Sequence, residues 1–168
     1  MKKIIIHHRS SHHSTYSVYA QLINYLDDVE VISGENSFLS GRLARFIKNK
    51  NNSKYGLYDS NSAKKNEELI RKLFFSKQKN ALIHYLNGER DIRQAIGLFE
   101  KKSKSVATFH KPPLVLEKTI TDTKYLKKLN GAIAVGTNQV DFLKNWLNND
   151  NVTYIPHGIN TDFFVPDN

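Results

Sequence analysis

The feature that most constrains the fold of this chain is a regular alternation between short β-type runs and helical patterns. In its second half, apolar runs predict strands over residues 81–85, 105–109, 131–135 and 152–155. Between the strands, apolar residues recur at helical spacing, as in the helix marked by Val140, Leu143 and Leu147. Strands that alternate with helices in this way indicate βαβ units and a mostly parallel sheet.

The first half follows the same pattern less regularly. Strands are predicted over residues 2–8 and 29–33, and a helix that begins after Ser14 and carries apolar residues up to Leu26 connects them. Apolar residues at helical spacing predict further helices over residues 39–47, 69–74, 92–99 and 125–129.

Polar and proline-containing stretches mark the connections. Residues 48–62 predict a polar loop, the Pro112–Pro113 pair is expected to exclude helix, and Thr137 is expected to cap the last helix. We therefore expect residues 1–160 to form one Rossmann-like, doubly wound α/β domain, with a mostly parallel sheet and helices on both faces. Residues 161–168 are expected to start a connection to a further domain.

Composition excludes several classes of protein. The chain has 168 residues and no cysteine, which excludes a disulfide framework and a thiolate zinc site. The first apolar run stops after three residues at His7, too early for a secretory signal, and no run approaches the roughly 20 apolar residues of a membrane span. The net charge of +9 predicts anionic partners. Common nucleic-acid-binding patterns do not occur, so no nucleic-acid partner is expected. The lack of cysteine fits a cytoplasmic protein.

All seven histidines fall at or just beyond the carboxyl ends of predicted strands. They are His7 and His8 in the first strand, His12 and His13 in the loop after it, His84, His110 and His157. Open α/β sheets bind their ligands at this edge. A single histidine at a strand end is more often structural, but seven at one edge predict a ligand-binding crevice.

The loop after the first strand excludes several kinds of ligand site. The first glycine is Gly34, so the loop cannot be the glycine-rich loop of a dinucleotide site, and no P-loop or G-x-S-x-G sequence occurs. His7 and His8 would point to opposite faces of a strand and have no carboxylate nearby, which argues against a metal site. The helix that begins at Ser14 offers free N–H groups, which suit a phosphate or a polyhydroxylated ligand.

Four segments of the chain resemble one family of enzymes. The N-terminal domain of GT-B fold glycosyltransferases, family 4 in particular, has strand-end segments similar to LIHYLNGE (82–89), SVATFHKPP (105–113) and GAIAVGTNQVDFL (131–143). The most specific match is IPHGINTDFF (155–164), which resembles the segment that closes this domain and leads into the C-terminal one. The segments occur in the family's order.

The resemblance implies a function and a set of site residues. The implied reaction moves a sugar from a nucleotide diphosphate-sugar to an acceptor hydroxyl with retention at the anomeric carbon, and it needs no metal or other cofactor. His110 matches the family histidine that contacts the donor sugar and its phosphate. The other donor-facing positions are Thr137, Asn138, His157 and Gly158. The acceptor-binding positions are Ser11, His12, Ser14, Tyr16 and His84.

Departures from the family pattern shape these expectations. The first loop, RSSHHSTYS, has no glycine, so its side chains rather than its backbone are expected to act, on the acceptor side. No two glutamates are eight positions apart, so the donor-binding E-x7-E motif is missing. We therefore expect this chain to be the acceptor-side half of a longer enzyme, inactive alone, whose acceptor is a glycan or a lipid-linked molecule. The basic helix over residues 39–48 is either a peripheral dock on the anionic inner membrane face or an ordinary solvated helix.

Other interpretations stay open. His110 could simply bond a backbone carbonyl at the end of a strand, and Thr137 and Asn138 could simply cap a helix. A nucleotide-sugar epimerase shares the GT-B fold but would need carboxylates near the strand ends. A response-regulator-like signalling domain would need an acidic cluster after the first strand. A basic phosphate- or nucleic-acid-binding module would lose affinity steeply with salt.

Overall fold

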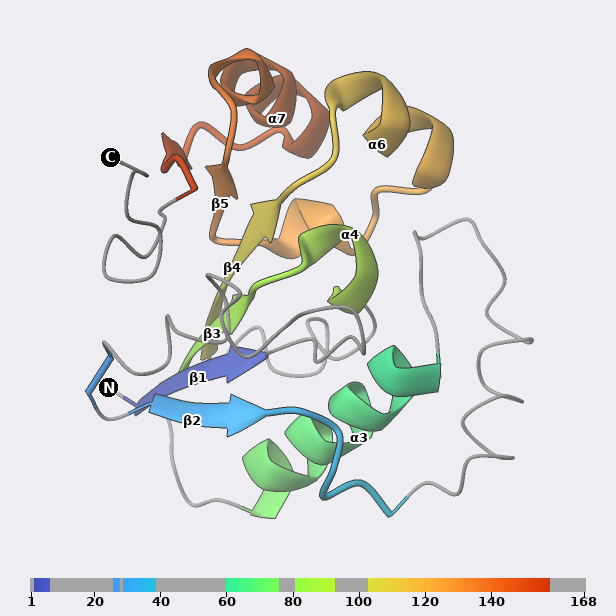
Figure 1. Cartoon of the computed structure of the whole chain (residues 1–168), viewed down its shortest axis with the longest axis vertical. Helices are drawn as coiled ribbons and strands as arrows, with labels where there is room; N and C mark the ends of the chain where they lie inside the picture. The colour runs from blue at the N-terminus through green and yellow to red at the C-terminus, as the bar shows by residue number, and fades with distance from the viewer. Residues whose placement is uncertain are drawn as a thin grey trace, which may run out of the picture.

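The computed structural model of the chain describes residues 2–6, 26–27, 29–38, 60–75, 81–92 and 103–157 (Figure 1). The strands are β1 (Lys2–Ile6), β2 (Val29–Ile32), β3 (Ala81–Tyr85), β4 (Ser103–Phe109), β5 (Gly131–Ala134) and β6 (Val152–Tyr154). The helices are α3 (Ser60–Phe75), α4 (Gly88–Asp91), α6 (Pro113–Thr119) and α7 (Val140–Leu147), with single 3-10 turns η2 (Leu126–Lys128) and η3 (Thr137–Gln139). Within these ranges, no helix combines the length and the apolar character that a membrane crossing requires.

The six strands form one parallel sheet in the order β2-β1-β3-β4-β5-β6. Every neighbouring pair in this sheet is parallel. The predicted α/β fold with a mostly parallel sheet is therefore confirmed. The chain passes from β1 outward to β2 and then returns across β1 to β3, so the direction of winding reverses between β1 and β3. Open α/β sheets hold ligands at such a reversal, outside the carboxyl ends of the strands.

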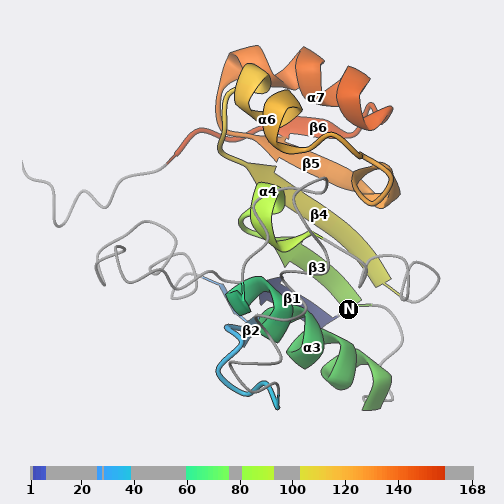
Figure 2. The same ribbon diagram turned by 90° about the vertical axis from the view of Figure 1, so that its right-hand side faces the viewer.

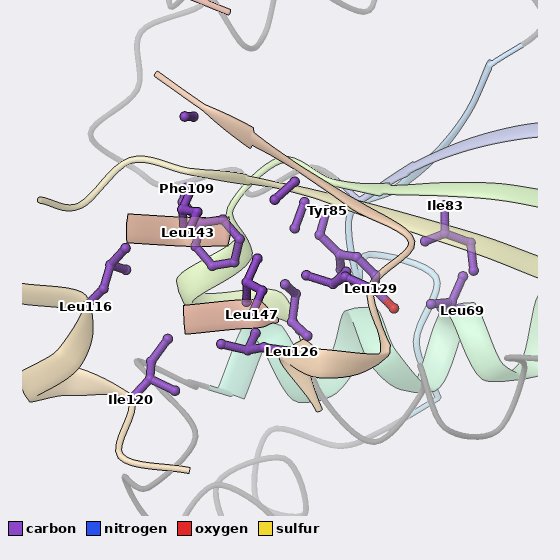
Figure 3. Close-up of a cluster of buried hydrophobic side chains, with 14 of the residues drawn as sticks. Leu69, Ile83, Tyr85, Phe109, Leu116, Ile120, Leu126, Leu129, Leu143 and Leu147 are labelled. Carbon is purple, nitrogen blue, oxygen red and sulfur yellow. The ribbon is translucent and has the colours of Figure 1, made fainter. Parts of the chain in front are cut away.

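The hydrophobic core packs against one face of this sheet. The register pairs Tyr85 with Ala107 and Ala107 with Ala132, so buried side chains form a row across β3, β4 and β5. Leu69 from α3 and Leu143 from α7 belong to the same buried cluster (Figure 3). Figure 2 shows α3 near the β2 end of the sheet and α6 and α7 near its β5 and β6 end. Each such leucine contributes roughly 2 kcal/mol by burial.

The second face carries His84 and Thr108, because successive side chains of a strand point to opposite faces. Thr108 is buried there and His84 is partly buried. The helices predicted over residues 14–26 and 39–47 lie outside the described residues, apart from Leu26. The prediction of helices on both faces therefore stays a prediction, as does the domain boundary at residue 160.

The expectation that Pro112 and Pro113 exclude helix is wrong for the second proline. Helix α6 begins at Pro113, and Pro112 precedes it in an extended conformation (φ −57°, ψ 154°). A proline at the first helical position lacks only an N–H that has no partner in the first turn, and its fixed φ suits the helix. The prolines therefore define where α6 starts.

Two predicted helices differ from the structure. The helix expected over residues 125–129 is a single 3-10 turn, η2, whose first residue Leu126 and following residue Leu129 are both buried. Apolar residues three apart face the same way in a 3-10 turn as well as in an α-helix, so spacing alone could not separate them. Ile92 was expected inside a helix, but it is buried and extended directly after α4 (φ −75°, ψ 117°). The remainder of that predicted helix lies outside the described residues.

Most element boundaries differ only slightly from prediction. Strand β3 matches its predicted range, and β4 begins at Ser103 rather than at residue 105. Helix α3 begins at Ser60, inside the stretch predicted as a polar loop up to residue 62. Its first three residues, SNS, are all polar. Hydrophobic spacing therefore could not show where the helix starts.

Candidate functional site at the carboxyl ends of the strands

Two of the predicted histidines meet at this edge. His110 directly follows β4, and His157 follows β6 by three residues. Their imidazole rings stack with centroids 5.3 Å apart and planes inclined by 18°. The strand-end segments that carry them are separated in the sheet by β5. The sequence-based expectation that strand-end histidines gather is therefore met for this pair.

The ring of His110 is held by the turn after the neighbouring strand. Its Nε2 lies 2.6 Å from the carbonyl oxygen of Leu86. Because a carbonyl oxygen only accepts hydrogen bonds, Nε2 must carry the proton and donate it. The neutral imidazole therefore has its lone pair on Nδ1. The bond to a backbone carbonyl is the structural role that the sequence left open for His110. It also means that Nδ1, rather than Nε2, is the ring nitrogen that could act on a ligand.

Glu89 is a site residue that sequence reasoning missed. Its side chain is buried, with the residue 2% exposed, and its Oε2 accepts a hydrogen bond of 3.4 Å from the backbone N–H of His110. Burial raises the pKa of this carboxyl, although bonds from its own N–H and that of His110, and the nearby charges of Lys111 and Arg90, act in the opposite direction. An acidic residue directly after an Asn-Gly pair at a strand end was the signal that could have found it.

His84, predicted to bind the acceptor, is instead bonded within the sheet. Its Nε2 lies 2.8 Å from Oγ1 of Thr108 on the adjacent strand β4. Burial, with a smaller contribution from the positive charge of His110, lowers the pKa of His84 from 6.5 to about 4. His84 is therefore neutral at physiological pH. Its predicted acceptor role stays a prediction.

His157 is the exposed member of the stacked pair. Partial removal of the ring from water lowers its pKa, and the positive charge of His110 lowers it further. Two stacked imidazoles disfavour a second proton once one ring is charged. A positive charge on His110 therefore disfavours a second positive charge on His157.

Gln139 ties two strand-end loops together. Its Oε1 accepts hydrogen bonds of 2.9 Å from the N–H groups of Val135 and Gly136, and its Nε2 donates a bond of 2.8 Å to the carbonyl of Lys111. The side chain is buried, with the residue 3% exposed. Through it, the loop after β4 that carries His110 is held against the loop after β5.

The predicted donor-facing residues Thr137 and Asn138 lie in that second loop, and both are exposed. The expectation that Thr137 caps the last helix is wrong. Thr137 is the first residue of η3, Gly136 precedes that turn, and Gln139 occupies the cap position of α7. The Gln139 side chain makes no capping bond to α7 but caps the 3-10 turn η3, because it accepts hydrogen bonds from the N–H groups of Val135 and Gly136.

The remaining predicted site residues lie outside the described residues. They are Ser11, His12, Ser14, Tyr16 and Gly158, together with His7, His8 and His13. Among the residues that the structure does describe, no group of three or more histidine or carboxylate side chains is arranged to hold a metal ion.

Gly88 fits the turn after β3 against β4 so closely that a side chain has no space. A Cβ atom there would lie 3.0 Å from the carbonyl oxygen of Thr108 and 3.1 Å from Cβ of Ala107. We expect Gly88→Ala to lower the free energy of unfolding by about 1–3 kcal/mol, because these β4 atoms cannot move aside. Urea denaturation would measure this. The control is Gly136→Ala, whose Cβ would lie 2.9 Å from Oδ1 of the exposed Asn138 side chain, which can rotate away, and in ordinary contact with Gln139. Equal stabilities of the two variants would contradict the packing argument.

Comparisons with models of known protein families, with curated proteins and with solved structures gave no significant match. The chemistry of this edge therefore has to follow from its own residues. An imidazole pair, a buried carboxyl and the exposed Lys111 can together hold an anionic, hydroxyl-bearing ligand.

Proposed function

We propose that this chain is the acceptor-side domain of a retaining glycosyltransferase with the Rossmann-like, doubly wound architecture of the GT-B fold. The observation that carries the proposal is the stacking of His110 on His157. These residues belong to two of the four segments that resemble family 4, SVATFHKPP and IPHGINTDFF. Their contact lies at the edge of a parallel sheet where a ligand is expected.

In the proposed reaction the bond between the anomeric carbon and the diphosphate breaks, and a bond to the acceptor oxygen forms on the same face. The acceptor proton leaves with the diphosphate. His110 keeps its Nε2 proton on Leu86, so it faces the donor through Nδ1. A neutral ring accepts a hydrogen bond from a sugar hydroxyl there, and a charged ring donates one to a phosphate oxygen. Lys111 adds positive charge for the departing diphosphate.

The His110→Ala variant tests this role. In the complete gene product, with the second α/β domain that we expect downstream of residue 168, the variant should lower kcat/KM for sugar transfer by about tenfold or more. The loss corresponds to one hydrogen bond made in the transition state. Release of nucleoside diphosphate from UDP- and GDP-hexoses would measure it.

The matched control is Lys118→Ala, an exposed position on α6 away from the strand ends, which should leave transfer unchanged. Unchanged transfer by His110→Ala would remove His110 from the site. A downstream sequence without a second α/β domain that carries an E-x7-E motif would overturn the two-domain proposal as a whole.

Glu89 favours a second candidate, the nucleotide-sugar epimerase of the same fold. This class needs a carboxyl group in the crevice, and Glu89 lies buried beside His110 with a raised pKa. An epimerase would interconvert two nucleotide-sugars without any acceptor. Incubation of the complete gene product with a nucleotide-sugar in deuterium oxide separates the candidates, because an epimerase would exchange a sugar C–H for deuterium and a transferase would not.

A further inference from the structure

The loop after β2 and the C-terminal half of α3 border a separate, shallow cleft that is open to solvent. Its volume is about 490 Å³, and it is lined by Glu35, Asn36, Ser37, Phe38, Arg71 and Lys72. Small-molecule sites typically occupy about 300–1,000 Å³, so the cleft is large enough for a ligand of one or two rings. Figure 1 shows this loop beside α3, at the β2 end of the sheet.

The loop that forms the cleft is held in place by carboxylates of α3. The side chain of Glu68 is fully buried, and its two oxygens accept hydrogen bonds from the N–H of Gly34 (2.9 Å) and from Nδ2 of Asn36 (3.3 Å). Glu67 accepts the backbone N–H of Phe38 at 3.1 Å. Gly34 has φ +85°, which a residue with a side chain rarely adopts. The cleft is therefore formed before any ligand binds.

Phe38 is 80% exposed, although its backbone is fixed by this loop. The guanidinium of Arg71 lies 4.4 Å from the centroid of its ring, which covers one face of the ring. Arg71 also donates a bond of 2.6 Å to the carbonyl of Asn36. An exposed aromatic ring whose one face is covered by a cation and whose backbone N–H is bonded offers a platform for a flat ligand on its other face.

The charges around the cleft argue against an anionic ligand. Arg71 lies 3.4 Å from a carboxylate oxygen of Glu67, and Lys72 forms ion pairs with Glu68 and Glu30. Each cation of the cleft is thus already opposed by a carboxylate, and the lining adds Glu35. A phosphate would meet at least as much negative as positive charge. A neutral ligand with several hydroxyl groups would instead find donors and acceptors side by side.

We infer that this cleft binds a saccharide ring, which stacks on the face of Phe38 that Arg71 leaves uncovered while its hydroxyls bond polar side chains of the lining such as Asn36. The C–H bonds on the face of a sugar ring carry partial positive charge, which suits the negative face of an aromatic ring. The amide of Asn36, whose nitrogen already donates to Glu68, also carries an oxygen that can accept a hydrogen bond from a sugar hydroxyl. The binding of a saccharide follows from the exposed Phe38 ring and the polar groups beside it, whatever reaction the protein catalyses.

The position of the cleft assigns it to the acceptor, and this step rests on the proposed function. Strand β2 is three places along the sheet from β4. At about 4.8 Å per strand, the cleft is offset by at least about 14 Å along the sheet from the loop that carries His110. That distance exceeds one sugar ring, so the saccharide in the cleft is not the unit that receives the transferred sugar. The acceptor is therefore a chain of at least two sugar units.

Saturation-transfer NMR on the 168-residue chain tests the inference. The probes are cellotriose, maltotriose, chitotriose and a mannotriose at millimolar concentration, with inorganic phosphate as the anionic comparison. We expect at least one trisaccharide to bind and to lose about tenfold in affinity in Phe38→Ala, which removes the stacking platform. Phe38→Tyr, which keeps the ring, should bind like the wild type. Leu114→Ala, which removes an exposed apolar side chain on α6, should also bind like the wild type.

Three outcomes would overturn the inference. They are no binding of any trisaccharide, equal binding by Phe38→Ala, and phosphate binding that depends on Arg71. In the complete gene product, Phe38→Ala should raise KM for an oligosaccharide acceptor with kcat unchanged. If trisaccharides bind at Phe38 but no sugar transfer is found, the saccharide site stands and only the proposed transferase function fails.

Discussion

The Gln139→Leu variant should lower the free energy of unfolding by about 3 kcal/mol. Leucine has nearly the same volume but leaves three backbone groups without a partner, namely the N–H groups of Val135 and Gly136 and the carbonyl of Lys111. Each unpaired group in a partly buried position costs about 1–3 kcal/mol, and solvent can reach some of them in the exposed loops. The loop after β4 should also lose its link to the loop after β5, so the stacking of His110 on His157 should weaken.

Chemical denaturation would measure the loss of stability, and the imidazole resonances of His110 and His157 would report the loss of stacking. Gln139→Glu is the informative comparison. Its carboxylate can still accept from Val135 and Gly136 but has no proton for the carbonyl of Lys111, so its stability should lie between the other two proteins. A leucine variant as stable as the wild type would show that the side-chain bonds of Gln139 contribute nothing.

Acidification from pH 7 to pH 4 should remove about 3 kcal/mol of stability through His84 alone. The folded protein holds the pKa of His84 at about 4, against 6.5 in the unfolded chain. Below pH 6.5, His84 is therefore protonated in the unfolded state but stays neutral in the folded state until the pH approaches 4. This contribution is fully present above pH 6.5 and is lost as the pH falls towards 4.

Glu89 acts in the opposite direction over part of the same range. Its raised pKa means that the folded state takes up a proton before the unfolded state does, so falling pH stabilises the fold through this group. Glu89 therefore offsets part of the contribution of His84, whereas His157, whose pKa is lowered, adds to it. A variant at residue 84 is needed to separate these contributions.

His84→Gln provides this separation, because glutamine can still bond Oγ1 of Thr108 but does not titrate. Unfolding free energies of both proteins at intervals from pH 7 to pH 4 would give the difference directly. We expect the free energy of unfolding of the variant to rise relative to that of the wild type as the pH falls, by about 3 kcal/mol at pH 4. A constant difference across this range would show that His84 titrates normally in the folded protein.

Period and propensity predicted those parts of the fold where one physical effect dominates. The strands were found because short runs of β-forming residues lie between helical patterns, and in β3 every second residue is buried in the core. Helix α6 was missed because PPLVLEKT has only one buried side chain, Leu116, and so shows no amphipathic period. The 3-10 turn η2 was taken for a helix because Leu126 and Leu129 satisfy either period.

The candidate site was predictable only in part, for a related reason. Position at strand ends correctly brought His110 and His157 to one edge, because parallel strands all end on the same side. Glu89 and Gln139 were missed, since their roles depend on burial and on backbone groups distant in sequence, such as the carbonyl of Lys111. Phe38 was missed because a lone aromatic residue after a strand predicts core more often than surface.

The hydrogen bond from Nε2 of His110 to the carbonyl of Leu86 affects how much the surroundings must rearrange when the ring is protonated. Nε2 carries a proton in both the neutral and the charged ring, so that bond persists when Nδ1 gains or loses a proton. The ring can change its charge without turning, and the surrounding dipoles need little reorganisation. A group of this kind responds to a ligand's charge at almost fixed geometry, which is the form of preorganisation that stabilises a charged transition state most cheaply.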